Sequence, residues 1–300
     1  MKRRKYLPLS INATATHDTK RGEDSRARLN ILTEKASDWI GLTNPWLTLN
    51  YPLKVQLGDV TVPDPIEEYF IYQSLAGAIP MDTITDNTFL ERIEVYLQKA
   101  LREAKIHTNW NQPTVDYENA VLEFTRRILN SEHPFKSQFF NFVNSITDAG
   151  ITNSLSQLVL KCTCPGIPDF YQGTELWDLS LVDPDNRRQI NYEERYRLLK
   201  EIIQLAKEKP SAFFGELLNN KRDGRIKLWM THQLMQERAA HPHVFNEGEY
   251  LPLEVKGLLS DHILAFARVR ENNWYLTIIP LYTSLLERTP IKISSTGIIH

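Results

Sequence analysis

Cysteine is scarce in this sequence, because the 300 residues hold only Cys162 and Cys164. Two cysteines so close together suit neither an ordinary disulfide nor a zinc site with four ligands. We therefore expect reduced thiols and a cytoplasmic location. Glycine is also low: 12 of the 300 residues, or 4%, are glycine, whereas the usual share is about 7%. Low glycine favours a largely helical chain.

The sequence also lacks an excess of one charge and any long apolar run. The 35 lysines and arginines nearly balance the 37 acidic residues, which excludes a basic surface for nucleic acid and an acidic tail. No apolar run reaches the roughly 18 residues of a membrane span, and the N-terminal residues do not form a signal peptide. We expect a globular protein that binds neither nucleic acid nor a membrane.

Hydrophobic periodicity predicts helices through most of residues 23–163 and again near 192–208 and 226–240. Asp64-Pro-Ile-Glu67 is typical of a helix start with a capping box, and Ser154 is expected to begin a separate helix that ends before Pro165. Strands are expected at 12–17, 167–171, 250–253, 263–269 and 274–279. The change from helices to strands places a domain boundary near residue 241.

The sharpest chemical signal follows the first expected strand, where a helix is about to begin: His17, Asp18, Lys20 and Arg21. Barrel enzymes place reacting side chains at the carboxyl ends of strands. A histidine and a carboxylate there can bind neighbouring sugar hydroxyls, with bonds that strengthen as the ring becomes oxocarbenium-like. The same residues are also typical of a helix cap, formed by Asp18, beside a solvated basic face.

Two later stretches offer sugar-binding groups. Residues 165–175 enclose a short apolar strand between prolines and glycines, and Tyr171 and Gln172 follow it with an aromatic ring and an amide. In Asp183-Pro-Asp-Asn-Arg-Arg188, Asp185 and Arg187 are candidates for ordering a saccharide site. Both stretches are also typical of turn-rich surface loops. The eight histidines show no metal-ligand spacing, so we expect no metal site.

Taken together, these stretches resemble the α-amylase superfamily (family 13 glycoside hydrolases) and, more narrowly, the maltooligosyl trehalose synthase family. His17-Asp18 matches the end of the superfamily's last catalytic motif, after the seventh barrel strand, and residues 16–28 have the narrower family's form of it. Residues 165–177 match that family's eighth-strand motif, and the 183–188 loop completes the set. The resemblance runs from about Leu7 to the end of the chain.

The resemblance implies an α/β fold with mostly helical content. Residues 1–240 would be the C-terminal part of a (β/α)8 barrel, namely strands seven and eight, with a helical insertion at about 24–150. Residues 241–300 would begin an all-β C-terminal domain of the β-sandwich type.

The resemblance also implies an activity. The family converts the reducing-end α-1,4 link of a maltooligosaccharide into an α,α-1,1 trehalose link by a retaining route, as a (1→4)-α-D-glucan 1-α-D-glucosylmutase, which is an isomerase. Asp18 would stabilise the transition state, assisted by His17. The substrate-binding candidates are Lys20, Arg21, Tyr171, Gln172, Asp185 and Arg187. No metal or organic cofactor is needed, and the functional partner would be maltooligosyl trehalose trehalohydrolase.

One departure from the family limits these expectations. No segment resembles the superfamily motifs that carry the nucleophilic aspartate and the acid/base glutamate. We therefore expect a fragment, inactive alone, that needs the missing N-terminal barrel portion. The alternatives are another α-glucan hydrolase of the superfamily, which the 20–24 extension argues against, and a non-catalytic helical or saccharide-binding remnant.

Overall fold

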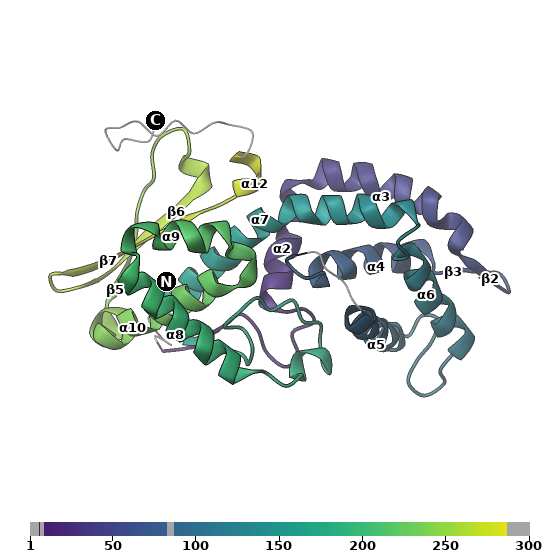
Figure 1. The fold of residues 1–300 in the computed structure, drawn as a ribbon, viewed down its shortest axis with the longest axis horizontal. Coiled ribbons are helices and arrows are strands. Elements are labelled where there is room, and N and C mark those ends of the chain that lie inside the picture. Colours follow the sequence, from purple (N-terminus) through teal and green to yellow (C-terminus); the bar gives the residue numbers. More distant parts are fainter. Residues whose placement is uncertain (1–5, 7–8, 83–86, 287–300) are drawn as a thin grey trace. The chain divides into compact units, whose positions relative to one another are not determined.

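The computed structural model describes Tyr6, residues 9–82 and residues 87–286 (Figure 1). Within these residues the chain is mostly helical with small sheets, which confirms the expected helical content. None of the helices described is both long and apolar enough to cross a membrane. The chain divides into two compact units: unit 1 is Met1–Thr19, Ala149–Asp178 and Gln189–His300, and unit 2 is Lys20–Asp148 and Leu179–Arg188.

Unit 2 is built almost entirely from helices. They are α2 (Glu23–Glu34), α3 (Ala36–Asn50), α4 (Pro65–Ala78), α5 (Asn87–Ala104), α6 (Val115–Ile128) and the first half of α7 (Pro134–Thr163). A hairpin that the sequence did not predict joins α3 to α4, and short 3-10 turns complete the unit: β2 (Val55–Leu57), β3 (Val60–Val62), η1 (Tyr51–Leu53) and η2 (Asp185–Arg187).

An aromatic cluster holds the helices of unit 2 together. Trp46 of α3 is fully buried, and its ring meets those of Tyr72, Phe135 and Phe139 at centroid distances of 5.8, 5.2 and 5.5 Å. Each such edge contact is worth about 0.5–1.5 kcal/mol beyond the area it buries. The indole also donates a 2.9 Å hydrogen bond to Gln138. The cluster therefore fixes α3 alongside the first half of α7, as Figure 1 shows.

The ends of two helices test the sequence predictions. Asp64 caps α4 as predicted, because its carboxylate accepts hydrogen bonds from the N–H groups of Ile66 and Glu67, both at 2.8 Å. The prediction of a new helix at Ser154 was wrong, because α7 runs unbroken and Ser154 is buried inside it. Buried apolar residues continue past the serine, so tertiary packing overrides its preference for a cap.

Unit 1 contains strands near the two positions predicted at 12–17 and 167–171, each shorter than expected. β1 (Ile11–Ala13) and β4 (Ile167–Asp169) pair in parallel, with Asn12 opposite Pro168. Gly166 makes this close approach possible, because its φ is +125° and a Cβ there would lie 2.5 Å from the Ser10 carbonyl oxygen. A side chain at this position would push the strands apart.

The rest of unit 1 comprises helices and an antiparallel sheet of three strands in the order β5-β6-β7. The helices are α8 (Tyr192–Glu208), α9 (Pro210–Asn219), α10 (Arg225–Ala240), α11 (Pro242–Glu247) and α12 (Thr283–Leu286), with η3 (Lys221–Asp223) and η4 (Ser260–His262). The strands are β5 (Glu249–Pro252), β6 (Ile263–Arg270) and β7 (Asn273–Pro280). The predicted strands after residue 241 are confirmed, whereas the β-sandwich domain stays a prediction.

Two buried arginines complete the C-terminal end of α7. Arg238 donates to the carbonyls of Cys162 (2.6 Å) and Gly166 (3.1 Å), and Arg268 donates to that of Thr163 (3.1 Å). The last carbonyls of a helix have no partner within the helix, and a guanidinium suits the negative end of its dipole. These arginines therefore fix the point from which the chain enters β4.

A buried carboxylate joins α5 to α6 in unit 2. Glu118 accepts hydrogen bonds from Arg102 Nε (2.8 Å) and Nη2 (2.7 Å), from Thr108 (2.7 Å) and from Gln98 (3.0 Å). The hydrogen bonds from Arg102 hold the pKa of Glu118 below its ordinary value, although burial alone would raise it. The ionised form therefore stabilises the fold.

We expect Glu118→Gln to lower the free energy of unfolding at pH 7 by about 1.5–3 kcal/mol, because charge-assisted hydrogen bonds are lost. The lowered pKa means that Glu118 stabilises the fold above its ordinary pKa of 4.5. This stabilisation disappears as the pH falls through the folded-state value. Urea unfolding below pH 4.5 should therefore depend less on pH in the variant.

Glu123→Gln is the matched control, on the same helix. Its side chain is 55% exposed and lies 3.5 Å from Arg126, so its loss should change stability by no more than about 0.5 kcal/mol. Equal effects of the two substitutions would contradict a structural role for Glu118.

Candidate functional site

His17 and Asp18 lie at the tip of a tight turn after β1. Thr16 and Thr19 close this turn: the Thr16 N–H donates to Thr19 Oγ1 at 2.8 Å, and the Thr19 N–H donates to the Thr16 carbonyl at 3.2 Å. The Asp18 N–H donates to Thr16 Oγ1 at 3.3 Å. Both side chains at the tip are exposed. The backbone is thus fixed by hydrogen bonds, while the imidazole and the carboxylate reach solvent.

Tyr171 and Gln172 begin a second turn, which follows β4. The N–H and the hydroxyl of Thr174 both donate to the Tyr171 carbonyl, at 3.2 and 2.7 Å. Gly173 has a φ of +89°, a conformation that favours glycine. Tyr171 is half-buried and Gln172 is exposed, so a ring and an amide are presented at the surface.

The parallel pairing of β1 with β4 relates these two turns. In a parallel pair the carboxyl ends of both strands lie at the same edge, so both turns leave from one end of the sheet. Lys161, which is 4% exposed, contacts the chain ahead of each turn: its Nζ lies 3.0 Å from Thr14 Oγ1 and 4.0 Å from the centre of the Phe170 ring. Unit 1 therefore brings His17 and Asp18 to the same strand ends as Tyr171 and Gln172.

Unit 2 brings the chain after Thr19 to the polar loop 179–188. Arg21 forms an isolated antiparallel bridge with Leu181, and the Gly22 N–H donates to the Ser180 carbonyl at 2.7 Å. Within unit 2, Arg21 and Gly22 therefore lie beside the start of the polar loop, although more than 150 residues separate them in the sequence.

The side chains of Lys20 and Arg21 differ in their surroundings. Arg21 is half-buried, donates to Ser74 Oγ at 3.2 Å and lies 5.6 Å from the centre of the Phe70 ring. Lys20 is exposed and forms a 3.3 Å ion pair with Glu103. Arg21 is held in one place, whereas the Lys20 pair is of the weak surface type.

Asp185 organises the polar loop. Its carboxylate accepts two hydrogen bonds from Arg92 of α5, at 2.7 and 2.9 Å, and one from the Leu181 N–H at 2.8 Å. Asp185 is buried, while Arg187 is exposed and pairs with Asp183 at 3.1 Å. No pattern in the sequence singles out Arg92, because it lies in α5 among other charged residues. Asp185 therefore stabilises the conformation of the loop, whereas Arg187 lies at the surface.

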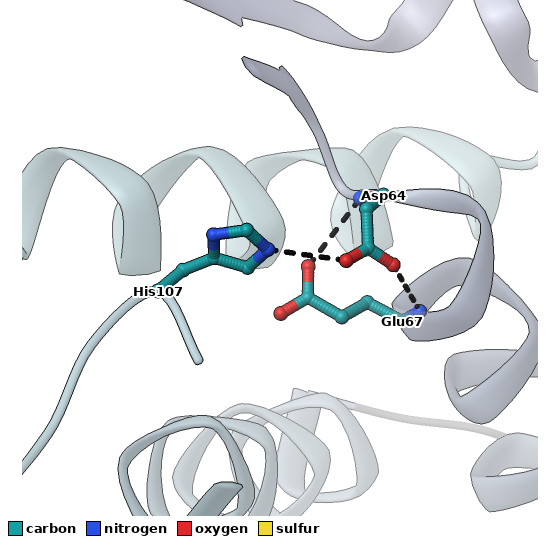
Figure 2. A group of neighbouring side chains, drawn as sticks. All are labelled: Asp64, Glu67 and His107. Atoms are coloured by element: carbon teal, nitrogen blue, oxygen red, sulfur yellow. Dashed lines mark hydrogen bonds and ion pairs between the residues drawn. The ribbon is translucent and has the colours of Figure 1, made fainter. Parts of the chain in front are cut away.

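A second group of polar side chains gathers in unit 2 (Figure 2). Asp64, Glu67 and His107 each offer one ligand atom, and these atoms lie within 4.8 Å of one another. His107 Nε2 is 3.1 Å from Asp64 Oδ2. No sequence pattern predicts this group, because Asp64 and Glu67 have the pattern of a helix cap and His107 lies 40 positions after Glu67 in the chain.

Two of three comparisons with known proteins found similar proteins. No family model matches the chain. Two proteins of Mycobacterium tuberculosis, from strains CDC 1551 / Oshkosh and ATCC 25618 / H37Rv, bear names assigning them to maltooligosyl trehalose synthase. Both are 31% identical to this chain over 293 residues, which is 93% of this chain and 34% of each relative. The chain is related to the maltooligosyl trehalose synthases.

Solved structures of maltooligosyl trehalose synthases also match this chain. A crystal structure of a maltooligosyl trehalose synthase matches at 34% identity with a TM-score of 0.75, over 91% of this chain and 34% of that one. The Arthrobacter ramosus synthase matches at 28% identity with a TM-score of 0.75, over 96% of this chain and 34% of that one. The resemblance to the maltooligosyl trehalose synthases is confirmed. The chain spans about a third of the length of the synthases it matches.

The Asp185 interactions can be tested by Asp185→Asn. We expect the free energy of unfolding to fall by about 3–5 kcal/mol, because Arg92 would remain as an unpaired, largely buried charge. Urea titration followed by circular dichroism measures this loss. Asp183→Asn removes a carboxylate from the same loop, where the pair is exposed, and should cost less than about 1 kcal/mol. If Asp185→Asn lowered the free energy of unfolding no more than Asp183→Asn does, Asp185 would not stabilise the loop in this way.

Proposed function

We propose that this chain contributes the transition-state-stabilising side of a maltooligosyl trehalose synthase. The reaction is an intramolecular transglycosylation that turns the reducing-end α-1,4 link of a maltooligosaccharide into an α,α-1,1 link. The observation that carries the proposal is the parallel register of β1 and β4, because it directs the turns bearing Asp18 and Tyr171 from one end of the sheet. The relation to the synthases supplies the reaction.

Asp18 and His17 have the chemistry that a developing oxocarbenium ion requires. An exposed carboxylate on a fixed turn can accept hydrogen bonds from the 2- and 3-hydroxyls of the reacting glucose, and its charge opposes the positive charge that forms on the ring. His17 would donate to the same sugar. Tyr171 would supply a face for a sugar ring and Gln172 an amide for its hydroxyls.

The remaining candidates would hold the departing glucose until its anomeric hydroxyl attacks. The Lys20–Glu103 pair is exposed, so the ammonium can exchange this weak partner for a sugar hydroxyl. Arg21 is fixed by Ser74 and Phe70, which suits a residue that must keep a substrate oriented. Arg187 would bind sugar from the loop that Asp185 shapes.

We also propose that the barrel is completed by strands outside this chain. Ile11 and Ile167 lie opposite each other in the β1–β4 pair and are 64% and 45% exposed. Parallel sheets are normally covered on both faces, and further strands and helices of a (β/α)8 barrel would cover these residues. That N-terminal barrel portion would provide the nucleophile and the acid/base residue.

Several broader features belong to this proposal. Residues 1–240 would form the end of the barrel, with the insertion at about 24–150, and 241–300 would begin a β-sandwich. The product would pass to maltooligosyl trehalose trehalohydrolase in the cytoplasm.

The test combines this chain with the two-thirds of the Arthrobacter ramosus synthase that it does not match. Maltopentaose should gain a trehalose end only when both parts are present, as measured by chromatography. Asp18→Asn should lower that rate by about 100-fold or more, the scale of losing one electrostatic transition-state contact. Asp59→Asn, the same change at an exposed carboxylate in the β2–β3 turn, should leave the rate unchanged.

Titration of the chain alone with maltopentaose, followed by NMR, provides a second measurement. Binding that weakens in Asp18→Asn supports the assignment even if the two parts fail to assemble. Turnover of maltopentaose by the chain alone would contradict the proposal that the nucleophile lies outside this chain. An affinity for maltopentaose that is unchanged in Asp18→Asn would favour a saccharide-binding remnant.

A further inference from the structure

The group formed by Asp64, Glu67 and His107 is only partly explained by the start of α4. The capping box uses Asp64 Oδ1, which accepts from two backbone N–H groups, and Glu67 Oε2, which accepts from the Asp64 N–H at 3.3 Å. It does not use Asp64 Oδ2 or Glu67 Oε1. Figure 2 shows both of these oxygens on the side of the imidazole of His107.

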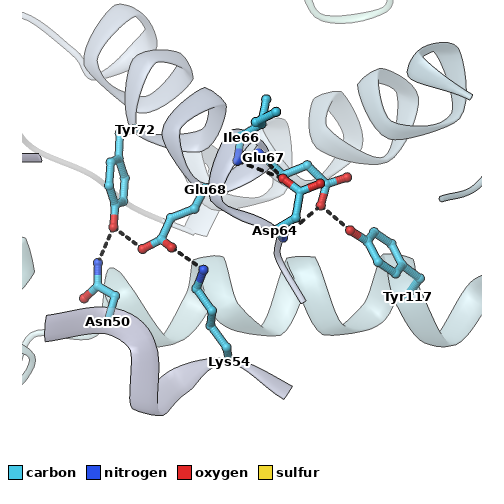
Figure 3. Close-up of polar contacts among 8 residues, drawn as sticks. All are labelled: Asn50, Lys54, Asp64, Ile66, Glu67, Glu68, Tyr72 and Tyr117. Carbon is cyan, nitrogen blue, oxygen red and sulfur yellow. Dashed lines mark hydrogen bonds and ion pairs between the residues drawn. The ribbon is translucent and has the colours of Figure 1, made fainter. Parts of the chain in front are cut away.

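Within the part of the chain that the structure describes, neither carboxylate has a lysine or arginine partner. Among the residues described, no lysine or arginine lies within 4.0 Å of Asp64 or Glu67, and His107 is the only potentially cationic group beside them. Lys54, which Figure 3 shows close to the start of α4, pairs with Glu68 at 2.6 Å. Two half-buried carboxylates thus face one imidazole, and this arrangement favours a bound cation.

The orientation of these side chains is fixed before any ligand binds. The Tyr117 hydroxyl donates to Glu67 Oε2, and its ring stacks on His107 with centroids 4.5 Å apart. Burial raises the pKa of Glu67, and the charge of Asp64 adds to this effect. Outer contacts of this kind orient metal ligands in proteins.

We infer that Asp64, Glu67 and His107 form a binding site for one divalent transition-metal ion, with zinc as the probe. An imidazole nitrogen and two carboxylate oxygens are the ligand types that zinc takes, with water completing the tetrahedron. The ligand atoms would be His107 Nε2, Asp64 Oδ2 and one carboxylate oxygen of Glu67. Metal binding at Nε2 requires the neutral imidazole with its hydrogen on Nδ1, so any proton on Nε2 is released to solvent.

Such an ion would act as a structural link within unit 2. Asp64 and Glu67 belong to the first turn of α4, whereas His107 lies in the segment between α5 and α6. Metal binding would strengthen the link between these elements that the His107–Asp64 hydrogen bond already makes. This inference does not depend on the proposed function.

The experiment uses the full chain without a tag, after removal of metals with a chelator. Isothermal titration with zinc should show one equivalent bound, and zinc should raise the unfolding temperature. His107→Ala should weaken binding by at least about tenfold, since even outer contacts of a metal site are worth 10–100-fold. Titration with cobalt should give visible d–d bands that excess zinc abolishes.

Two further variants make the result decisive. Glu67→Gln keeps an oxygen that can accept hydrogen bonds from Asp64 and Tyr117, so this variant should fold normally. It should still bind zinc more weakly, and it therefore tests the site even if His107→Ala does not fold. His243→Ala removes an imidazole whose side chain is 77% exposed and should bind like the wild type. Absence of binding by the wild type, or full affinity in the folded Glu67→Gln and His107→Ala variants, would overturn the inference.

Discussion

The parallel hydrogen bonding between β1 and β4 determines where the candidate chemistry can lie. A shift of one residue in that register would turn Asn12 and Pro168 to the opposite face. Three contacts hold the register: the Asn12 amide donates to the Pro165 carbonyl at 3.2 Å, Gly166 admits the neighbouring backbone, and Lys161 lies beneath both strand ends. Each of these contacts comes from the segment that ends α7 and begins β4.

Charged side chains connect the elements of unit 2. Their hydrogen bonds are directional, whereas apolar packing is not. Arg92 holds the polar loop through Asp185, and Arg102 joins α5 to α6 through Glu118. Arg28 is fully buried in α2 and donates to the carbonyls of Ala76 and Ile79 at the end of α4, at 3.2 and 2.6 Å. A buried charge tolerates only one arrangement of its partners, so these groups specify orientation.

Local patterns in the sequence predicted what depends on local interactions. The capping box at Asp64 and the strands after residue 241 are confirmed, because caps and alternation act over a few residues. Ser154 was misread, since the packing of α7 along its whole length outweighs one residue's preference. The hairpin β2–β3 and helix α9 were missed, because both are short and weakly patterned.

In the candidate site, too, the sequence pattern predicts individual residues, whereas the tertiary fold determines which of them lie together. The motifs named His17, Asp18, Tyr171 and Gln172, but only the pairing of two distant strands relates the first pair to the second. Lys161 and Arg92 carried no sequence signal, because a buried charge inside a helix looks like any surface charge. His107 reaches Asp64 through the tertiary fold alone, so spacing along the chain could not reveal that group.

The distance along the chain between β1 and β4 has a consequence for how the protein folds. The hydrogen bond from Asn12 to Pro165 spans 153 positions, and contacts of such long range form slowly because a large loop must close first. The hydrogen bonds within helices α2 to α6 are local, so they can form earlier. The two turns that present the imidazole, the carboxylate and the phenol would then take their final places late, after the helical segments between them have collapsed.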